Sequence, residues 1–401
     1  MKIIIAGAGA VGTHLAKLLS RERHDITVMD ENRERMGDLS SNFDLLTICD
    51  SPMSIQGLKD AEVGKADLFI GVTPDEAHNM TCCMLASKLG ARKTVARVDN
   101  YEYTLEENKS FFRSVGIDSI IYPEMLAGRE IISNIKRSWV RQWIDIHDGE
   151  LIMVGVKLRE SAQILNKPLR DLFDPATPCH VVAVKREDET LIPHGNDCLH
   201  LGDIAFFMTT PEYVNYIRDI TGKDKYPDVK TIFFMGGSST AVHALWNMPD
   251  YMHAKVFEPN PKRCERLNEL LAGQNNVLVI NGDGTDPNLL MDEGIHKAEA
   301  FAALTESSEQ NILACLSARR LGIKKTVAMV ENSDYIKVAE NLDIGFIINK
   351  KTFAASHIYQ MMLDTDVANV KCLTIAKADV AEFIAGEGSL ITTVPVRELK
   401  L

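Results

Sequence analysis

Short apolar runs alternate with amphipathic segments through the first part of the chain. The runs are bounded by polar or turn residues and are too short for buried helices, which is typical of buried strands. The segments between them carry apolar residues at helical spacing. The pattern therefore predicts six strands with helices between them, at residues 2–6, 25–30, 44–48, 66–72, 93–98 and 117–121.

The texture of the chain changes after the sixth predicted strand. Pro123 opens a segment that reaches residue 137 with apolar residues at helical spacing, which predicts one amphipathic helix beginning near the proline. We expect it to be a crossover helix that leaves its lobe to contact another. From about Trp139 onward, strand-like runs at 150–158, 180–184 and 204–208 are separated by proline and glycine. This part indicates a small β-rich domain.

The same order of predicted strands and helices is then repeated in the second part of the chain. The segment 91–98 (ARKTVARV) returns as 323–330 (IKKTVAMV), and 117–121 returns as 344–348. Because the matches keep both their order and nearly constant spacing along the whole chain, they indicate duplication of a complete unit.

The fold class predicted from these patterns is α/β. Alternating strands and helices form a parallel sheet covered on both faces, so each copy contributes a Rossmann-type, doubly wound lobe. Each lobe is followed by a small β-rich α+β domain. The second of these is so short that we expect it to be truncated, the alternative being that it needs a partner to complete its sheet. The predicted domains are 1–138, including the amphipathic helix, 139–222, 229–368 and 369–401, with a turn-rich linker before the second lobe.

Composition and charge exclude several classes of protein. An apolar share of 45% and a charged share of 25% are values of a folded globular chain. A net charge of −12 argues against a nucleic-acid partner or an anionic membrane surface. No apolar run is long enough to span a bilayer, the start does not resemble a signal peptide, and the eight cysteines form no CxxC pair. We therefore expect a cytoplasmic protein with reduced thiols and no metal site.

A glycine-rich turn directly after the first predicted strand is the most informative motif. In the sequence GAGAVG, Gly7 permits a tight turn, Gly9 lets the backbone approach a pyrophosphate, and Gly12 lets the helix pack closely. Asp30, at the end of the second strand, is placed to bind an adenosine ribose and to repel a 2′-phosphate. This favours NAD or NADH, with ATP or ADP possible at the same site. Residues expected around this site are Gly7, Ala8, Gly9, Ala10, Val11, Gly12, Asp30, Cys49, Asp50, Thr73, Pro74 and Arg97.

Arg97 stands at a strand end where a guanidinium can clamp a phosphate, although a salt bridge explains it equally well. In the second copy, Ser238 and Ala241 replace two of the three glycines, and Met329 replaces the arginine. Two interpretations remain open for this copy, a second nucleotide site or a degenerate structural lobe. Its candidate site residues are Gly236, Gly237, Ser238, Glu258, Asp283 and Thr305.

No motif for catalysis accompanies these sites. The chain lacks a nucleophile motif, a P-loop and an HExxH pattern. His14 and His243 occupy matching places in the first helix of each lobe, and Asp145, His147 and Asp148 cluster near the β-rich domain, but both features are better explained structurally. An NAD-dependent oxidoreductase stays as the alternative, because the same fingerprint serves dehydrogenases.

Taken together, these motifs resemble those of the Trk potassium-uptake regulators, the TrkA family, whose lobes are called RCK or KTN domains. The resemblance covers essentially the whole chain and rests on the tandem layout and on segments 5–12, 28–30, 73–79, 95–98 and 281–287. Asp50 departs from the family pattern, as do the replaced glycines of the second lobe.

The resemblance implies a cytoplasmic, non-catalytic regulator. It would bind NAD(H) or ATP/ADP, assemble as a homotetramer, and reach the inner face of the membrane only through a potassium-translocating subunit of the TrkH or TrkG type. A regulator of a different cation transporter would share every motif named above, so this alternative also stays open.

Overall fold

A computed structural model gives the structure of the chain, and it describes all residues except 21–23, 175–176, 188, 363–366, 373–378, 384, 387, 396–397 and 400–401. The chain divides into two compact units. The first consists of Met1–Ile132 together with Lys230–Met362, and the second of Ser133–Val229 together with Leu363–Leu401. Both lobes therefore belong to one unit.

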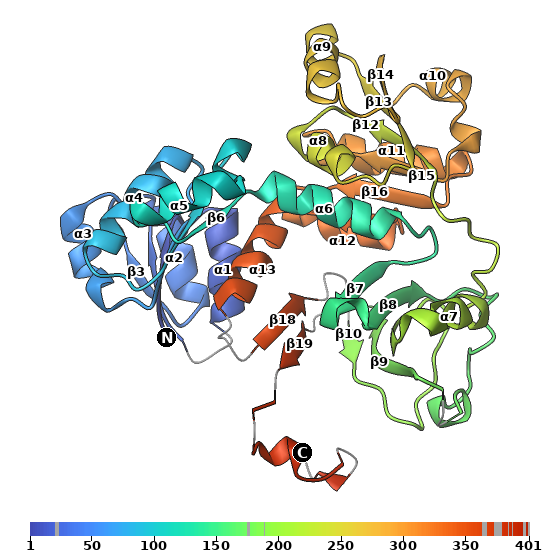
Figure 1. Ribbon diagram of the computed structural model, residues 1–401, viewed down its shortest axis with the longest axis horizontal. Helices are drawn as coiled ribbons and strands as arrows, with labels where there is room; N and C mark the ends of the chain where they lie inside the picture. The colour runs from blue at the N-terminus through green and yellow to red at the C-terminus, as the bar shows by residue number, and fades with distance from the viewer. Residues whose placement is uncertain are drawn as a thin grey trace. The chain divides into compact units, whose positions relative to one another are not determined.

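The first lobe, drawn in blue to teal in Figure 1, is a parallel sheet with strand order β3-β2-β1-β4-β5-β6. All six predicted strands are present, most of them slightly shorter than predicted, and the fold class is confirmed. The strands are β1 (Lys2–Ala6), β2 (Asp25–Met29), β3 (Leu46–Ile48), β4 (Leu68–Gly71), β5 (Thr94–Arg97) and β6 (Ser119–Ile121), and the helices are α1 (Ala10–Leu19), α2 (Arg33–Asn42), α3 (Ile55–Asp60), α4 (Glu76–Lys88), α5 (Glu106–Ser114) and α6 (Pro123–Ile135).

The second lobe repeats this topology element by element, with strand order β14-β13-β12-β15-β16-β17. The duplication read from the sequence is therefore visible in the fold. Its strands are β12 (Thr231–Met235), β13 (His253–Glu258), β14 (Val277–Asn281), β15 (Ala300–Ala303), β16 (Lys325–Met329) and β17 (Phe346–Ile348), and its helices are α8 (Ser239–Trp246), α9 (Pro261–Leu270), α10 (Pro287–Asp292), α11 (Ser308–Arg320), α12 (Ser333–Asn341) and α13 (Lys350–Met362).

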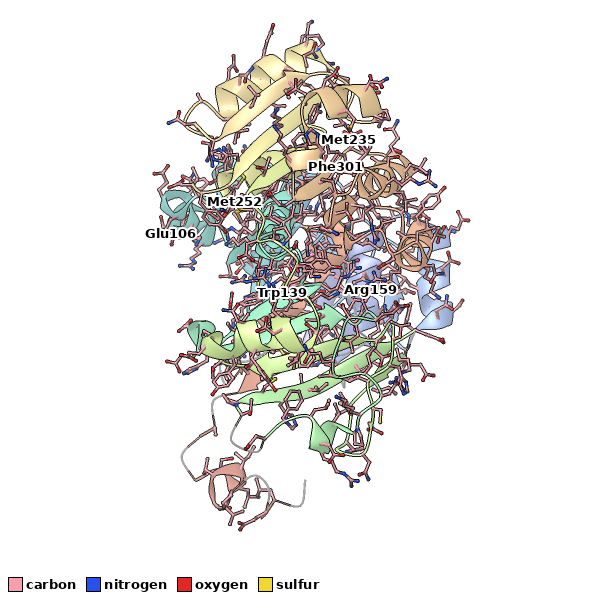
Figure 2. The ribbon with its side chains drawn as sticks, turned by 90° about the vertical axis from the view of Figure 1, so that its right-hand side faces the viewer. Glu106, Trp139, Arg159, Met235, Met252 and Phe301 are labelled. Atoms are coloured by element: carbon pink, nitrogen blue, oxygen red, sulfur yellow. The ribbon has the colours of Figure 1, made fainter. Side chains whose placement is uncertain are left out.

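The central strands explain why the apolar runs were continuous. Helices cover both faces of a doubly wound sheet, so consecutive residues of a central strand are buried whichever face they point to. Ile3, Ile4 and Ile5 of β1 are fully buried, as is Phe301 of β15 in the second lobe. Figure 2 shows Phe301 and Met235 among the side chains of the second sheet.

The last helix of each lobe packs against the other lobe. Helix α6 touches α8 at Gly128, where an added Cβ would lie 2.7 Å from the amide nitrogen of Ala244. Helix α13 packs along α1, and Figure 1 shows the red-orange α13 beside the blue α1. The two lobes of the first unit are thus joined by a mutual exchange of helices.

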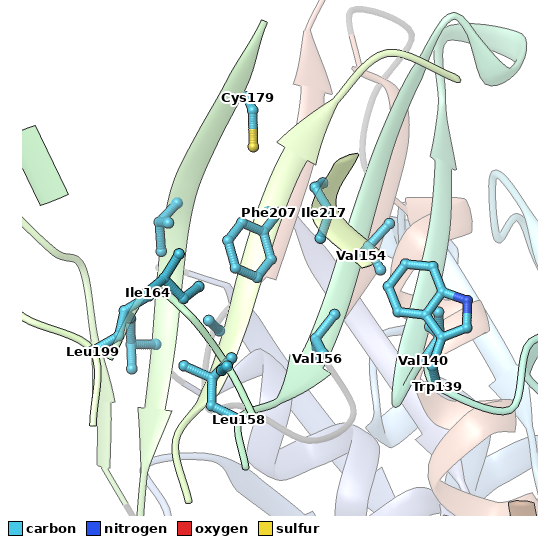
Figure 3. Close-up of a cluster of buried hydrophobic side chains, with 14 of the residues drawn as sticks. Trp139, Val140, Val154, Val156, Leu158, Ile164, Cys179, Leu199, Phe207 and Ile217 are labelled. Carbon is cyan, nitrogen blue, oxygen red and sulfur yellow. The ribbon is translucent and has the colours of Figure 1, made fainter. Parts of the chain in front are cut away.

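The second unit is built on an antiparallel sheet with order β10-β9-β11-β8-β7. Its core gathers Trp139, Val154, Phe207 and other buried side chains, as Figure 3 shows. The sequence indicated β8, β9 and β11 but missed β7 and β10, because β7 carries polar residues among its apolar ones and β10 is very short. The elements are β7 (Gln142–Ile146), β8 (Leu151–Lys157), β9 (Cys179–Arg186), β10 (Glu189–Leu191), β11 (Ile204–Thr209) and α7 (Val214–Ile220).

A two-stranded antiparallel sheet, β18 (Val367–Cys372) with β19 (Asp379–Phe383), belongs to the same unit. A second apolar cluster of this unit includes Ile144, Met153 and Phe206, and Val380 packs against it. His147 lies 3.0 Å from a carboxylate oxygen of Glu382. None of the described helices in either unit is long and apolar enough to cross a membrane.

Candidate functional site

The glycine turn of the first lobe joins β1 to α1. Gly7 adopts a φ of 113°, a left-handed conformation, and a Cβ there would lie 2.9 Å from the amide nitrogen of Thr73. A Cβ on Gly12 would overlap the carbonyl oxygen of Gly7. At Gly9, by contrast, a Cβ would meet no atom within 4 Å. Two glycines are thus required by the fold, while the third leaves the backbone open to a ligand.

Asp30 fastens this turn from the end of β2. Its Oδ2 accepts a hydrogen bond of 2.6 Å from the amide of Ala8, and its Oδ1 accepts one of 2.8 Å from the amide of Asn32. The carboxylate therefore holds the glycine turn against the start of α2. It remains partly exposed, so the remaining lone pairs are within reach of a ribose.

A buried asparagine ties the ends of β4 and β5 together. The side-chain amide of Asn79 donates to the carbonyl oxygens of Thr73 and Arg97, each at 3.0 Å, and its Oδ1 accepts from the amide of Thr73 at 2.7 Å. In the second lobe Asn311 makes the same contacts with Thr305 and Met329. The asparagine occurs in both copies of the sequence repeat, as Asn79 and Asn311, but only the structure shows its role.

The guanidinium of Arg97 points back into the protein. It donates to the carbonyl oxygens of Thr73 at 3.1 Å and Pro74 at 3.4 Å, and it pairs with Asp99 at 2.7 Å. Its side chain is 19% exposed. In this arrangement the Arg97 side chain stabilises the carboxyl edge of the sheet. To bind a phosphate, its guanidinium would have to break the ion pair with Asp99.

Cys49 and Asp50 follow β3 at the same edge. Cys49 is exposed, with Sγ 3.6 Å from the carbonyl oxygen of Glu31. The carboxylate of Asp50 accepts a hydrogen bond of 2.7 Å from the amide of Ser51 and lies so close to Gly57 that a Cβ on that glycine would overlap it. Asp50 thus packs on α3 instead of pointing freely outward.

The second lobe keeps the geometry of the first despite its altered turn. Gly236 adopts a φ of 92°, and the amide of Gly237 donates to Oε2 of Glu258 at 3.0 Å, as Ala8 does to Asp30. The amide of Asn260 donates to Oε1 at 3.1 Å. Glu258 is only 3% exposed.

Ser238 stands at the start of α8, where the first lobe has Gly9. Its side-chain oxygen accepts a hydrogen bond of 3.3 Å from the amide of Ala241 and so caps α8. The hydroxyl hydrogen stays available as a donor. The serine therefore changes the donors at the start of the helix without closing the turn.

A pocket of about 830 Å³ opens over this turn. All six candidate residues of the second copy line it, which brings Asp283 and Thr305 beside the glycine turn. Sequence reasoning missed five charged residues of its lining, because two come from the exchanged helices, two from the exposed face of α9 and one from the loop after β15. They are Glu124, Arg263, Arg266, Glu306 and Lys350.

Two of these charges come from different lobes. Glu124 is on α6 and Lys350 on α13, and their carboxylate and ammonium groups lie 3.1 Å apart. The second carboxylate oxygen of Glu124 is buried without a hydrogen-bond partner in the described part of the chain. An ion pair between the lobes thus stands at the wall of the pocket.

Aromatic residues surround His243 next to the pocket. Its ring centroid lies 4.9 Å from that of Tyr101, 5.0 Å from Tyr122 and 4.9 Å from Trp246. Burial lowers the pKa of His243 to about 4, partly opposed by Glu124, and burial raises the pKa of Tyr122 to about 12. His243 is therefore a neutral packing residue at pH 7. Among the described residues, no His, Cys, Asp and Glu cluster could hold a metal ion.

Family models match most of the chain. A TrkA-N domain model matches residues 3–123 and again 232–350, and a TrkA-C domain model matches residues 153–222. The two TrkA-N matches coincide with the two lobes described above.

Solved structures with the same fold include those of a channel, GsuK. The structure titled "GsuK channel bound to NAD" is 17% identical with a TM-score of 0.62, and the match covers 90% of this chain and 63% of that one. The structure titled "Crystal structure of the GsuK bound to ADP" is 14% identical with a TM-score of 0.53, covering 90% and 69%.

Curated relatives match over almost the full length. The Trk system potassium uptake protein TrkA of Haemophilus influenzae is 30% identical over 389 residues, which is 96% of this chain and 84% of that protein. The Trk system potassium uptake protein trkA homolog 1 of Methanosarcina mazei is 28% identical and covers 100% and 98%. With both lobes and the intervening domain matched, the chain belongs to the TrkA family of Trk system potassium uptake proteins.

Proposed function

We propose that this chain is the nucleotide-sensing regulatory subunit of a Trk-type potassium uptake system and performs no catalysis. It binds NAD(H) or ATP/ADP and gates a membrane potassium-translocating subunit of the TrkH or TrkG type. The observation that carries the proposal is the pair of equivalent glycine turns, each fastened by an acidic residue, in two lobes that exchange their last helices.

The geometry fits a pyrophosphate at each turn. Backbone amides at the start of α1 and α8 lie at the positive end of the helix dipole, which attracts phosphate. Gly9 leaves room for the ligand, and Asp30 is placed to accept a hydrogen bond from the ribose. Solved structures with the same fold are described as bound to NAD and to ADP, which supports these nucleotides as candidate ligands.

The exchanged helices supply the means of regulation. A ligand shifts a conformational equilibrium only through different affinity for the two states. A nucleotide in the second pocket lies beside Glu124 of the first lobe and Lys350 of the second, so any change in the angle between the lobes alters its contacts. The names of the relatives support potassium uptake as the process that this change controls.

The remaining parts of the proposal concern assembly and place. We propose a homotetramer that works in the cytoplasm and reaches the inner face of the membrane through its transporter partner alone. A chain with two lobes per copy would form an eight-lobed ring from four copies. Sedimentation of the purified chain, with and without nucleotide, measures this directly.

Calorimetric titration of NADH, NAD⁺, ATP and ADP into the full chain tests the proposal. We expect binding that Asp30→Ala weakens by about tenfold, since one hydrogen bond to a charged group contributes roughly 1.5–3 kcal/mol. Asp30→Asn, which keeps one acceptor for the amide of Ala8, should weaken it less. Absence of any nucleotide binding would contradict the proposal, and turnover of NADH with a small substrate would favour an oxidoreductase instead.

A further inference from the structure

We infer that the pocket of the second lobe takes an adenine dinucleotide carrying an additional phosphate on the adenosine ribose, of the NADP(H) class, whereas the first lobe prefers the unphosphorylated ribose. This inference rests on the proposed function, since it presupposes that the lobes bind nucleotides. It concerns only which nucleotide each lobe selects.

The segments that follow the second strand of each lobe differ in charge. Residues 30–39 carry four carboxylates and two arginines, whereas residues 258–267 carry two carboxylates and three cationic side chains. In the repeat, Asp38 of the first lobe corresponds to Arg266 of the second. The end of this strand is where a Rossmann lobe meets the adenosine ribose, and an arginine there accommodates a 2′-phosphate.

The acidic residue of the second lobe, Glu258, lines the pocket but is almost fully buried. Both carboxylate oxygens of Glu258 accept backbone hydrogen bonds, from Gly237 at 3.0 Å and from Asn260 at 3.1 Å. With 3% of its surface exposed, Glu258 presents little charge to a ligand. Asp30 makes similar bonds but remains partly exposed, so the first lobe keeps more of the repulsion towards a ribose phosphate.

Two arginines on α9 are available to bind this phosphate. Arg263 and Arg266 both line the pocket, and the guanidinium of Arg263 forms no hydrogen bond or ion pair among the residues that the structure describes. Among the described residues, the guanidinium of Arg266 forms an ion pair only with Glu269, at 3.0 Å. Both side chains of that pair are more than two-thirds exposed, so solvent weakens it. Guanidinium groups bind phosphate oxygens in pairs of parallel hydrogen bonds.

The pocket has separate places for the two kinds of phosphate. The pyrophosphate belongs at the start of α8, by Ser238, whereas the arginines lie on α9 beyond the strand that carries Glu258. Lys350 is already neutralised by Glu124. The two guanidinium groups of α9 therefore place positive charge at the ribose end, which favours an additional phosphate there.

Titration of NADPH and NADH into the full chain and into Arg263→Gln/Arg266→Gln tests this. We expect the double variant to lose at least about tenfold in NADPH affinity at one of the sites, because charge-assisted hydrogen bonds are lost, and to leave NADH affinity within about twofold. Arg35→Gln, which changes the residue of the first lobe that corresponds to Arg263, is the matched control and should leave NADPH binding unaltered. All three residues are on exposed helix faces, so the variants should fold.

The outcomes separate this inference from the proposed function. The inference is wrong, while the proposed function stands, if NADH binds but the wild-type chain binds NADPH and NADH with equal affinity at every site. The same holds if the double variant binds NADPH with the affinity of the wild type. If ATP loses as much affinity as NADPH in the double variant, the arginines bind a polyphosphate and the inference is also wrong. If no nucleotide binds at all, the proposed function itself fails.

Discussion

Gly12 and Gly9 stand three residues apart in one turn and have opposite structural requirements. A Cβ at Gly12 would overlap the carbonyl oxygen of Gly7, whereas a Cβ at Gly9 would meet nothing within 4 Å. We expect Gly12→Ala to destabilise the chain by about 1–3 kcal/mol through overpacking. Gly9→Ser, which copies the second lobe, should leave stability within about 0.5 kcal/mol. Urea unfolding measures both.

The two glycine variants also distinguish a role in stability from a role in ligand binding. Because Gly9 is open on the side of the turn, Gly9→Ser should weaken nucleotide binding while the unfolding midpoint stays the same. Equal destabilisation by both variants would contradict the assignment of Gly9 to the ligand. The second lobe already carries Ser238 and Ala241 at these positions and keeps its turn, which shows how such residues can be accommodated.

The buried imidazole of His243 makes stability depend on pH. Burial lowers its pKa from the ordinary 6.5 to about 4, against a smaller opposing effect of Glu124, and Arg129 lowers it further. The folded state therefore favours the neutral ring. This contribution is complete above pH 6.5 and is lost as the pH falls through 4. Between pH 7 and pH 4 the melting temperature of wild type should fall more than that of His243→Phe, and parallel curves would contradict this.

At the scale of elements, the ion pair between α6 and α13 links the two lobes. Glu124 and Lys350 are 16% and 23% exposed, so each depends on the other for compensation of its charge. We expect Lys350→Met to destabilise the chain by about 1–3 kcal/mol, less than for a fully buried pair, because Glu124 would keep an uncompensated carboxylate. Glu124→Gln/Lys350→Met should recover part of the loss. Urea unfolding of the single and double variants measures the coupling.

A surface pair within one element serves as the control for this cycle. Lys109 and Glu106 lie 2.5 Å apart on α5 but are 48% and 85% exposed. Lys109→Met should leave the unfolding midpoint unchanged, because solvent screens such pairs. Equal shifts of the unfolding midpoint in Lys109→Met and Lys350→Met would show that the ion pair between α6 and α13 contributes no more stability than a surface pair.

Elements were predictable from the sequence where burial imposes a simple pattern. Central strands such as β1 are buried on both faces and read as unbroken apolar runs. β7 was missed because Gln142 and Asp145 interrupt its pattern: Gln142 is buried in the sheet and Asp145 accepts a hydrogen bond from Trp143. Such compensation inside the fold leaves no periodic signal.

The candidate sites were predictable to the same degree. Glycine turns and acidic strand ends have fixed local spacing, so both copies could be located. Arg263 and Arg266 could not be assigned to a pocket, since only the direction of α9 brings them there. Glu124 lies on α6 of the other lobe. The sequence predicts that this helix leaves its lobe, but local spacing does not identify the pocket that Glu124 reaches.

At the scale of the whole molecule, helix exchange makes the two lobes interdependent. α6 of the first lobe packs on α8 at Gly128, and α13 of the second lobe packs on α1. Neither lobe keeps its full set of packed helices when the other unfolds. We therefore expect the lobes to lose structure together, a property suited to a regulator that transmits a ligand's effect.

Gly128→Ala tests this interdependence. Alanine favours a helix over glycine by roughly 0.5–1 kcal/mol, but here its Cβ would lie 2.7 Å from the amide nitrogen of Ala244 and from the Cβ of His243. Hydrogen-exchange protection should fall in β1 and in β12 alike. Gly37→Ala on α2, where a Cβ meets nothing within 4 Å, is the matched control and should raise stability slightly. Loss of protection confined to one lobe would show that the exchanged helices do not couple them.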